Sequence, residues 1–466
     1  MAWLAIDQGT SSTKAVVLDD AGAVLALAER PVTVDARAGG AVETDPDALW
    51  GSVVDAGRSA LADASSPALD AVSLSNQGET VLAWDRDSGR PLTPAIVWQD
   101  RRALAVCDAR RDHSAELRRI TGLELDPYFV APKLRWLRDH CGGEGVVGTT
   151  DTWLLQRLCG AFVTDIATAS RSLLLDLDEV RWSERCIDVF GLGAETLATV
   201  VPNDATLGET SAFGSAAAVR GICVDQQAAL FAEGCWEHGD TKCTYGTGAF
   251  LLTNTGPTPV RSRSGLVGCV AWQTETVGTR YCLDGQVYTV GAAASWLESI
   301  GLIDGPDDLD RLGGAVDDCD GATFVPGLAG LAAPFWAPDA RGAFVGLSLS
   351  TSRSHLVRSV LEGIAAQVAW LARGAAEDLG APLARLRVDG GATRSVVLMQ
   401  LQADLAQIPV ELYPSAHATA LGVAQLGGAP AAPWTPDAVY EPRITADAAE
   451  TRLEAWRAAA DATLSR

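Results

Sequence analysis

Two stretches of the chain share one pattern: an apolar strand, a polar tip that contains glycine, and a second apolar strand. The first is "LAIDQGTSSTKAVVL" at residues 4–18, and the second is "TKCTYGTGAFLLTNTG" at residues 241–256. Short apolar runs on both sides of a glycine turn predict β-hairpins. Since a hairpin of the same kind opens each half of the chain, we interpret the sequence as an ancient duplication, with two α/β lobes that face each other across a cleft.

The length of the chain agrees with two lobes. At 466 residues the chain is too long for a single hydrophobic core, and its 48% of hydrophobic and 20% of charged residues are ordinary for globular proteins. We expect an N-terminal lobe at residues 1–222 and a C-terminal lobe at residues 223–466.

Local signals place several elements within these lobes. Asp45 and Pro46 are typical of a helix start, as cap and first helical residue. Two strands are predicted around the polar turn at 76–79, and a buried strand that enters a helix is predicted within 95–111. In the second half, helical periodicity predicts helices at residues 289–300, 352–379, 393–407 and 446–465.

Charge and cysteine usage exclude some classes of function. The net charge is −23, from 36 Lys and Arg against 59 Asp and Glu, which argues against nucleic acid and anionic membranes as partners. No basic and apolar signal segment opens the chain, and the ten cysteines contain no C-x-x-C pair. We therefore expect reduced thiols and a cytoplasmic protein.

The tip of the first hairpin combines residue types that bind phosphate. Thr10, Ser11 and Ser12 offer hydroxyl donors, and Lys14 offers a positive charge. Backbone N–H groups in a glycine turn can form an anion-binding nest. Asp7, at the end of the strand, can hold Mg²⁺ through its waters. The alternative is a plain polar hairpin tip, because short glycine motifs recur by chance. Neither a P-loop nor a G-x-G-x-x-G turn followed by a helix is present.

Two further turns in the second half are of the same kind. Residues 246–248 read Gly-Thr-Gly, and residues 389–391 read Asp-Gly-Gly between a predicted strand and a helix. A helix start favours an anion, although each turn can also be only a tight connection. Three such turns in two lobes predict a nucleoside triphosphate with Mg²⁺, bound from both sides.

Asp225 stands between an apolar strand and an apolar helix in "ICVDQQAALFAEG" at residues 222–234. One interpretation makes it the N-cap of that helix, which is the commonest use of Asp there. The other places its carboxylate in the cleft, where it accepts the proton of a hydroxyl that attacks a γ-phosphate, with Gln226 orienting that hydroxyl.

The chain resembles the FGGY carbohydrate kinases, and within them most closely the glycerol kinases. The resemblance rests on stretches in family order across nearly the whole chain, among them "DQGTSSTKAVVLD", "SNQGETVLAWD", "AIVWQDRR", "TDIATASRSLLLD", "DQQAALF", "TYGTGAFLLTNTG" and "LRVDGGATRSVVLMQLQADL". It implies a two-lobe, actin-like (ribonuclease H-like) α/β fold with the active site between the lobes. It also implies ATP with Mg²⁺, and phosphorylation of a terminal hydroxyl on a small polyol or sugar.

The resemblance also implies roles for individual residues. Asp225 corresponds to the catalytic base and Asp7 to the acid linked to Mg²⁺. The phosphate hairpin corresponds to Thr10, Ser11, Ser12 and Lys14, with Lys14 where glycerol kinases have Arg. The glycerol pocket corresponds to Gly78, Glu79, Trp98, Tyr128, Asp225, Gln226 and Phe250. The nucleotide contacts correspond to Thr247, Gly291, Ser295, Gly391 and Ser395.

Three further positions depart from the family pattern. Glycerol kinases have Arg at the position of Gly78, where it donates hydrogen bonds to substrate hydroxyls. Ser295 and Ser395 replace amides expected near the nucleotide. Losing a charged donor in a dry pocket costs about 1.5–3 kcal/mol of binding. It also vacates space for a longer substrate.

We therefore expect glycerol as the substrate, with another polyol or a ketose (a tetritol, a pentitol, xylulose or ribulose) as the alternative. A more remote alternative is an actin-like ATPase without a metabolic substrate. For partners we expect the small-molecule substrate alone, with no nucleic acid and no membrane, and association as a homodimer stays open.

Overall fold

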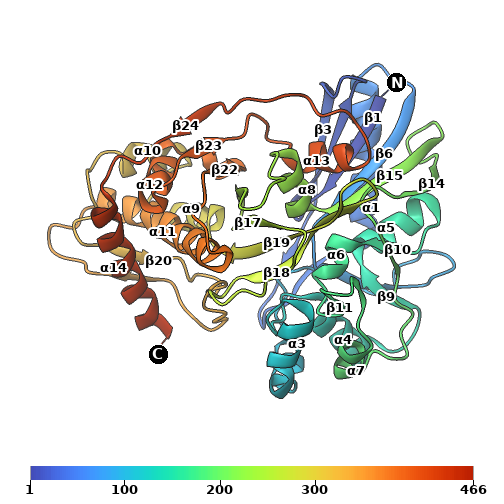
Figure 1. Cartoon of the computed structure of the whole chain (residues 1–466), viewed down its shortest axis with the longest axis horizontal. Helices are drawn as coiled ribbons and strands as arrows, with labels where there is room; N and C mark the ends of the chain where they lie inside the picture. The colour runs from blue at the N-terminus through green and yellow to red at the C-terminus, as the bar shows by residue number, and fades with distance from the viewer. Residues whose placement is uncertain (1, 465–466) are drawn as a thin grey trace.

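The computed structural model describes residues 2–464 and places the two halves of the chain beside each other (Figure 1). The N-terminal half, blue to green, and the C-terminal half, yellow to red, meet along the strands and helices at the centre of the molecule. The C-terminal helix lies at the far end of the second half, away from the first hairpin.

The first half contains the following elements. Its strands are β1 (Ala2–Gln8), β2 (Ser12–Leu18), β3 (Val24–Pro31), β4 (Asp35–Ala36), β5 (Val42–Thr44), β6 (Leu69–Asn76), β7 (Val81–Trp84), β8 (Ala95–Ile96), β9 (Val146–Thr149), β10 (Val163–Asp165), β11 (Leu175–Asp176), β12 (Arg181–Trp182), β13 (Thr199–Val201), β14 (Thr206–Thr210) and β15 (Ala217–Val224). Its helices are α1 (Pro46–Asp63), α2 (Leu104–Asp108), the 3-10 helix η1 (Arg111–His113), α3 (Ser114–Thr121), α4 (Val130–Cys141), α5 (Thr150–Cys159), α6 (Ile166–Ser170), α7 (Glu184–Phe190) and α8 (Asp225–Ala232).

The second half repeats the order of strands followed by helices. Its strands are β16 (Thr241–Tyr245), β17 (Ala249–Gly256), β18 (Val267–Thr274), β19 (Gly278–Val287), β20 (Thr323–Val325), β21 (Ala343–Val345), β22 (Leu386–Asp389), β23 (Val410–Leu412) and β24 (Ala438–Tyr440). Its helices are α9 (Gly291–Ser299), α10 (Asp307–Gly313), α11 (Arg353–Leu379), the 3-10 helix η2 (Gly391–Arg394), α12 (Val396–Ala406), α13 (Ala418–Leu426) and α14 (Ala446–Leu464).

The two main sheets share the topology of a five-stranded core. The first sheet has the order β14-β15-β6-β1-β2-β3, and the second has the order β18-β19-β17-β16-β22-β23-β24. In each, the opening hairpin is antiparallel, and its first strand pairs in parallel with a strand from much later in its half, β6 or β22. The shared core is β3-β2-β1-β6-β15 in one half and β19-β17-β16-β22-β23 in the other. The predicted duplication is confirmed by this strand order.

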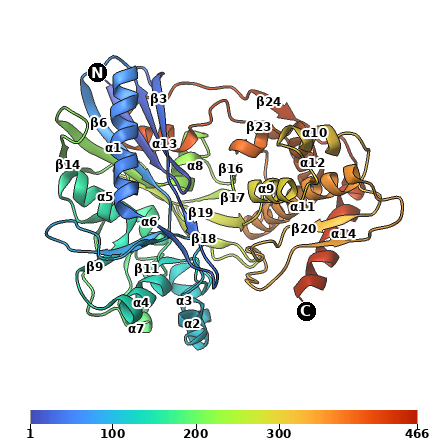
Figure 2. The same cartoon turned by 180° about the vertical axis from the view of Figure 1, so that it is seen from behind.

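Strand β1 is buried on both faces, and its alternating residues enter two different cores. Leu4 and Ile6 pack in the core that α1 covers, which is the face seen in Figure 2. Trp3 and Ala5 point the other way, into the core that contains Val423 of α13. Because successive side chains of a strand alternate between faces, a continuously apolar strand of this kind belongs in the middle of a layered sheet.

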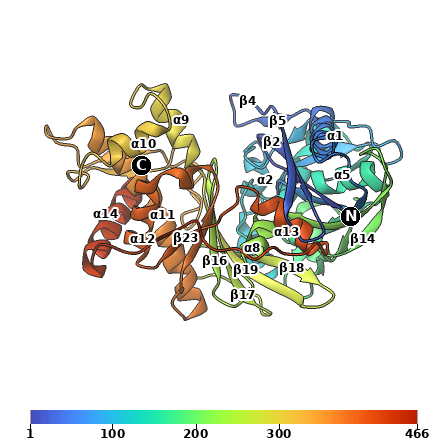
Figure 3. The ribbon, with the colours of Figure 1, turned by 90° about the horizontal axis from the view of Figure 1, so that it is seen from above.

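Helices α8 and α13 join the two halves. Each follows the last parallel strand of its own sheet, α8 after β15 and α13 after β23. They pack against each other, and α13 also packs on β6 and β1 of the first sheet. Figure 3 shows the pair side by side between the halves. Strand β15 runs to Val224 through the predicted lobe boundary at residue 222, and that boundary stays a prediction.

Most predicted elements lie where local signals placed them. Asp45 caps α1 by accepting a hydrogen bond from the Asp47 N–H, and Pro46 is the first helical residue. The helices predicted at 289–300, 352–379, 393–407 and 446–465 correspond to α9, α11, α12 and α14, and residue 465 lies outside the described residues. Within residues 2–464, no helix is long and apolar enough to cross a membrane.

The prediction of a strand that enters a helix within 95–111 is wrong in detail. Strand β8 has only two residues, and the first helix that follows, α2, has five. Between them the Asp100 carboxylate accepts hydrogen bonds from the N–H groups of Val42 and Arg102, at 2.8 and 2.9 Å. These bonds stabilise a turn that ends the apolar run.

Candidate active site

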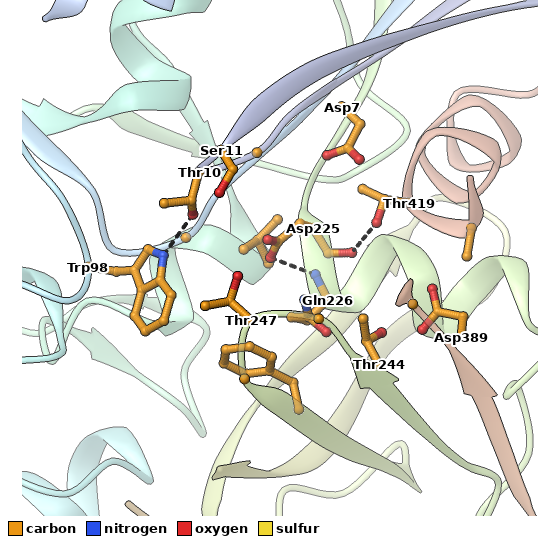
Figure 4. A pocket seen from close by; sticks show the side chains of 18 of the residues that line it. Asp7, Thr10, Ser11, Trp98, Asp225, Gln226, Thr244, Thr247, Asp389 and Thr419 are labelled. Carbon is orange, nitrogen blue, oxygen red and sulfur yellow. Dashed lines mark hydrogen bonds between the residues drawn. The ribbon is translucent and has the colours of Figure 1, made fainter. Parts of the chain in front are cut away.

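A cavity of about 270 Å³ lies between the tips of the two hairpins. Its wall is formed by the tip of β1 and β2, the start of α8, the tip of β16 and β17, the turn after β22 and the start of α13. Figure 4 shows Asp7, Asp225 and Asp389 around this space, with Thr10 and Trp98 on one side. Both halves of the duplication therefore contribute to one site.

Asp7 and Lys14 are direct partners across the first hairpin. The β1–β2 register pairs them, and the tip between them is closed by the Gly9 N–H, which donates to the Ser12 carbonyl at 3.0 Å. Burial raises the pKa of Asp7 to about 6, the charge of Lys14 opposes that rise, and Asp389 adds to it. Among residues 2–464 no group donates a hydrogen bond to the Asp7 carboxylate, so it is available to a cation.

Asp225 is the first residue of α8 and not its N-cap. The N-cap is Val224, and its side chain makes no capping bond. One carboxylate oxygen of Asp225, Oδ1, accepts a hydrogen bond from the Gln226 N–H at 2.7 Å. Burial, together with the nearby carboxyls of Asp7 and Glu79, raises the pKa of Asp225 to about 7. A carboxyl with a pKa near neutrality, facing a cavity, is suited to proton transfer at physiological pH.

Three aromatic rings form one end of the cavity. The ring of Trp98 lies edge-on to Tyr128 at 5.7 Å and to Phe250 at 6.0 Å between centroids. The Trp98 indole N–H donates to the Thr10 hydroxyl at 2.9 Å, a bond drawn in Figure 4. The aromatic end is thereby joined to the hairpin tip, so a ligand between them touches both.

Glu79 is held in a strained conformation beside these rings. Its φ is +56°, a left-handed value that residues other than glycine seldom adopt. Its carboxylate pairs with Arg171 at 2.6 Å, and Arg171 pairs in turn with Asp284 at 2.6 Å. All three side chains are buried, and all line the cavity. Backbone strain and a buried charge network at one place are features typical of functional sites.

The backbone at the tip of the second hairpin is packed so closely that it leaves no room for a side chain at Gly248. A Cβ atom at Gly248 would lie 2.5 Å from the Val287 carbonyl oxygen, so the chain passes too close for any side chain. Gly390 has a φ of +95°, and a Cβ there would lie 2.5 Å from the Tyr245 carbonyl oxygen. These two glycines are required by the close approach of the backbone at the cavity wall.

The structure brings most of the predicted site residues together. The cavity is lined by Asp7, Thr10, Ser11, Ser12, Lys14, Gly78, Glu79, Trp98, Tyr128, Asp225, Gln226, Thr247, Phe250 and Gly391. This common location is compatible with the roles predicted for them, which stay predictions.

Three predicted nucleotide contacts lie outside the lining. Gly291 donates its N–H to the Gly246 carbonyl at 3.0 Å, behind the hairpin tip. Ser295 is exposed on α9. The Ser395 hydroxyl donates to Asp310 at 2.5 Å and accepts from the Leu398 N–H as the cap of α12.

Sequence reasoning missed several groups at the site. Arg171 and Asp284 line the cavity, and Lys242 lies behind it, in contact with Gln226. Arg171 is the only charged residue within residues 166–175, and this lone charge is the one signal that could have found it. Asp389 belongs to a predicted turn, and its carboxyl lies at the cavity wall.

Chemically, the arrangement combines three capabilities in one cavity. Asp225 can accept a proton, the pocket of Trp98, Tyr128 and Phe250 can hold a small ligand beside polar groups, and the two hairpin tips can bind phosphate groups. This is the set of groups that phosphoryl transfer to a hydroxyl requires.

Comparisons with known proteins agree with this set of groups. Residues 2–232 match the profile of the N-terminal domain of the FGGY family of carbohydrate kinases, and residues 241–431 match that of its C-terminal domain. A glycerol kinase of Thermus brockianus is 41% identical, over 98% of this chain and 97% of that protein.

Solved structures of the same fold extend the comparison. The glycerol kinase of Plasmodium falciparum with ADP superimposes with a TM-score of 0.90 at 30% identity, over 99% of this chain and 98% of that one. A xylulose kinase of Lactobacillus acidophilus has a TM-score of 0.87 at 21% identity, over 99% and 97% of the two chains, and so shares the fold.

Proposed function

The chain belongs to the FGGY family of carbohydrate kinases, and from that premise we propose that it transfers the γ-phosphoryl group of ATP to a terminal hydroxyl of a small polyol, glycerol above all. As a member of this family it is a phosphotransferase with an alcohol group as acceptor. The observation that carries the proposal is the place of Asp225, between a pocket of polyol size and two phosphate-binding hairpin tips.

Asp225 is the base of the proposed reaction. The hydroxyl oxygen of the polyol attacks the γ-phosphorus of ATP, its proton passes to the Asp225 carboxylate, and the bond to the bridging oxygen breaks to release ADP. The raised pKa of Asp225, about 7, makes its carboxylate a stronger base than an exposed one. Gln226, the next residue, also lines the cavity and holds the hydroxyl in place.

The hairpin tips stabilise the charge on the transferred group. Thr10, Ser11 and Ser12 offer hydroxyl donors, Lys14 offers a positive charge, and residues 246–248 offer backbone N–H groups from the opposite side. Donors that are already oriented lower the barrier because they need no rearrangement as charge develops on the phosphoryl oxygens.

Mg²⁺ fits the site at Asp7. The Asp7 carboxylate has no hydrogen-bond donor among the described residues, and its pKa is raised by burial and, to a lesser extent, by a second acid nearby, Asp389. Oxygen ligands of this kind suit Mg²⁺, which binds through one or two carboxylates, waters and substrate phosphates. Bound there, the ion would neutralise phosphate charge.

Glycerol is supported by the relatives and by the shape of the pocket. Two curated relatives that match along 98% of the chain at 41% and 40% identity are glycerol kinases. Glu79, Arg171 and Asp284 offer both acceptors and donors to hydroxyl groups beside the aromatic rings. Gly78 offers none, and a Cβ atom at this position would lie 2.9 Å from a methyl group of Val224. The wall next to Gly78 is therefore apolar, and we expect a higher KM for glycerol than a charged donor there would allow.

The test measures ADP release by the full-length protein with ATP and Mg²⁺ on glycerol, erythritol, threitol, xylitol, xylulose and ribulose. We expect the highest kcat/KM with glycerol and a phosphorylated terminal carbon in the product. A higher kcat/KM with a pentitol or ketose would overturn the choice of glycerol. ATP hydrolysis at the same rate with and without every alcohol would overturn the kinase proposal in favour of an actin-like ATPase.

A cytoplasmic location and a homodimer complete the proposal. All ten cysteines are free, which supports a reducing compartment. Strand β3 is an edge strand with exposed Val24, Leu25 and Leu27, which supports pairing with a second copy. Light scattering on the purified protein measures the mass, and that of a single chain would contradict the dimer.

A further inference from the structure

Lys242 is a fully buried cation directly behind the cavity. It lies on β16, and none of its surface is exposed. Its ammonium group donates to the Gln226 side-chain oxygen Oε1 at 2.6 Å and to the Thr244 hydroxyl at 2.7 Å. In the described part of the chain, no carboxylate oxygen forms an ion pair with it at 4.0 Å or less. A buried Lys without a paired carboxylate is unusual, and its bonds to two neutral groups call for an explanation.

The chemistry of an ammonium group determines which way the Gln226 amide points. An ammonium group can only donate, so the amide must offer it the oxygen. The amide NH₂ group then faces away from Lys242. Gln226 lines the cavity, and between residues 2 and 464 its Nε2 finds no acceptor in the protein. The NH₂ group is therefore free to donate to a ligand in the cavity.

The second hydrogen bond of the Lys242 ammonium group, to Thr244, lies on the side of the cavity where we expect the phosphates. Because the Thr244 hydroxyl accepts from Lys242, its own proton is free to point toward the nearby Asp389 carboxyl. Burial raises the pKa of Asp389, and the charge of Lys242 and the Thr244 hydroxyl both oppose that rise. A single buried cation thus orients one chain of polar groups from Gln226 through Thr244 to Asp389.

We propose that Lys242 is a positioning residue, which locks the Gln226 amide with its NH₂ group toward the oxygen of the polyol. This inference rests on the proposed function, because it concerns the same alcohol pocket. Without Lys242 the amide is free to turn over, and it then presents its oxygen to the alcohol in half of its orientations or more. The competing explanation is that Lys242 only balances the buried carboxyls around it.

The experiment is a double-mutant cycle on the full-length protein, read as KM for glycerol and kcat. Lys242→Met keeps the length of the side chain, and we expect it to raise the KM for glycerol about fivefold to tenfold, the worth of one hydrogen bond. Gln226→Met should raise it by a similar factor. In the double variant the increase should not exceed that of Gln226→Met alone, because Lys242 acts through Gln226.

A matched control and a second substitution at Gln226 complete the design. Lys14→Met removes a cation on the phosphate side of the cavity, and it should raise the KM for ATP more than that for glycerol. Gln226→Glu keeps the contact with Lys242 as an ion pair but has no NH₂ group. We expect it to fold with an unchanged or raised Tm and still to lose affinity for glycerol as Gln226→Met does.

Each outcome decides the question. An unchanged KM for glycerol in Lys242→Met would mean that Lys242 only balances charge. The same conclusion would follow if Lys242→Met raised this KM by an equal factor whether residue 226 is Gln or Met. If Lys242→Met does not fold, Gln226→Glu decides, and a wild-type KM in that variant would overturn the inference. Failure of the wild-type protein to phosphorylate any alcohol would instead refute the proposed function.

Discussion

The two hairpins occupy equivalent places in the duplicated fold, but their side chains differ. In the first hairpin the second-last pair before the tip is Asp7 and Lys14. In the second hairpin the corresponding pair is Thr244 and Phe250. An acid and a cation in one half thus correspond to a hydroxyl and a phenyl ring in the other. The shared backbone places both tips at one cavity, and the side chains give each tip a different task.

The acids of the two halves also stand on different strands. Asp7 lies on the first strand of its sheet and is paired with Ser75 of β6. In the second sheet, Thr244 of the first strand is paired with Asp389 of β22. The helices that follow differ in the same way, because α8 begins with Asp225 and α13 with Ala418. We infer that the first half supplies the catalytic base and the cation site. The second half supplies uncharged groups that contact the phosphates of ATP.

The largest expected effect is on kcat, and it compares a substitution at the start of α8 with one at the start of α13. Asp225→Asn removes the base, and we expect kcat to fall about 10²–10⁴-fold while ATP affinity is kept. The matched change Thr419→Val at the start of α13 should lower kcat about threefold or less, since its hydroxyl only donates to the Asp225 carbonyl at 3.5 Å. Steady-state kinetics and ATP titration measure both. Equal losses in the two variants would contradict the division of labour.

The next comparison is between the two acids. Asp7→Asn should raise the Mg²⁺ concentration for half-maximal rate about tenfold to a hundredfold, the usual cost of changing a group that orients a metal through its waters. Asp389→Asn should change it less, because the charge of Lys242 and the nearby Thr244 hydroxyl already stabilise the Asp389 carboxylate. Rates measured across a Mg²⁺ series distinguish the two. A larger shift for Asp389→Asn would reassign the ion to the second half.

Glycines after β6 and β22, the strands that pair in parallel with the first strand of each half, provide a third comparison. Gly390→Ala forces a side chain onto a left-handed φ and into the Tyr245 carbonyl, and we expect a loss of about 1–3 kcal/mol of stability. Gly78 has no such φ, and its new methyl group would meet only the Val224 methyl. Gly78→Ala should therefore cost about 1 kcal/mol or less. Thermal unfolding measures both, and the reverse order would refute the argument from backbone geometry.

Local patterns were sufficient for the fold but not for all of the site. The hairpins, the Asp45 cap and the long helix α11 depend on neighbours in sequence, so strand periodicity and capping residues predict them. The turn at Asp100 was missed because its stabilising contact is with Val42, which lies 58 residues away. An apolar run shows that a strand can form, and does not show where a distant hydrogen bond ends it.

The charge network of the site was missed for the same reason. Arg171 meets Glu79 across 92 residues of sequence, and no local pattern predicts that contact. Ser395 is the opposite case. Its position in a matching motif predicts a nucleotide contact, whereas its hydroxyl caps α12 and contacts Asp310. Such residues can be assigned only when the packing of distant segments is known.

The smallest expected effect concerns stability at the two helix starts. The pKa of Asp225 is raised from 3.8 to about 7, so the folded state carries a cost when this carboxyl is ionised. That cost is complete above pH 7 and absent below pH 4, where the carboxyl is neutral in both folded and unfolded chains. Asp225→Asn should therefore raise the Tm at pH 8 by a few degrees, about 2–4 °C for each kcal/mol, and leave it unchanged at pH 4. Thr419→Val, at a helix start without a carboxyl, should shift the Tm equally at both pH values. If the Tm of Asp225→Asn at pH 8 equalled that of the wild type, the Asp225 carboxyl would be a solvated surface group. The contrast between α8 and α13 would then have no electrostatic basis.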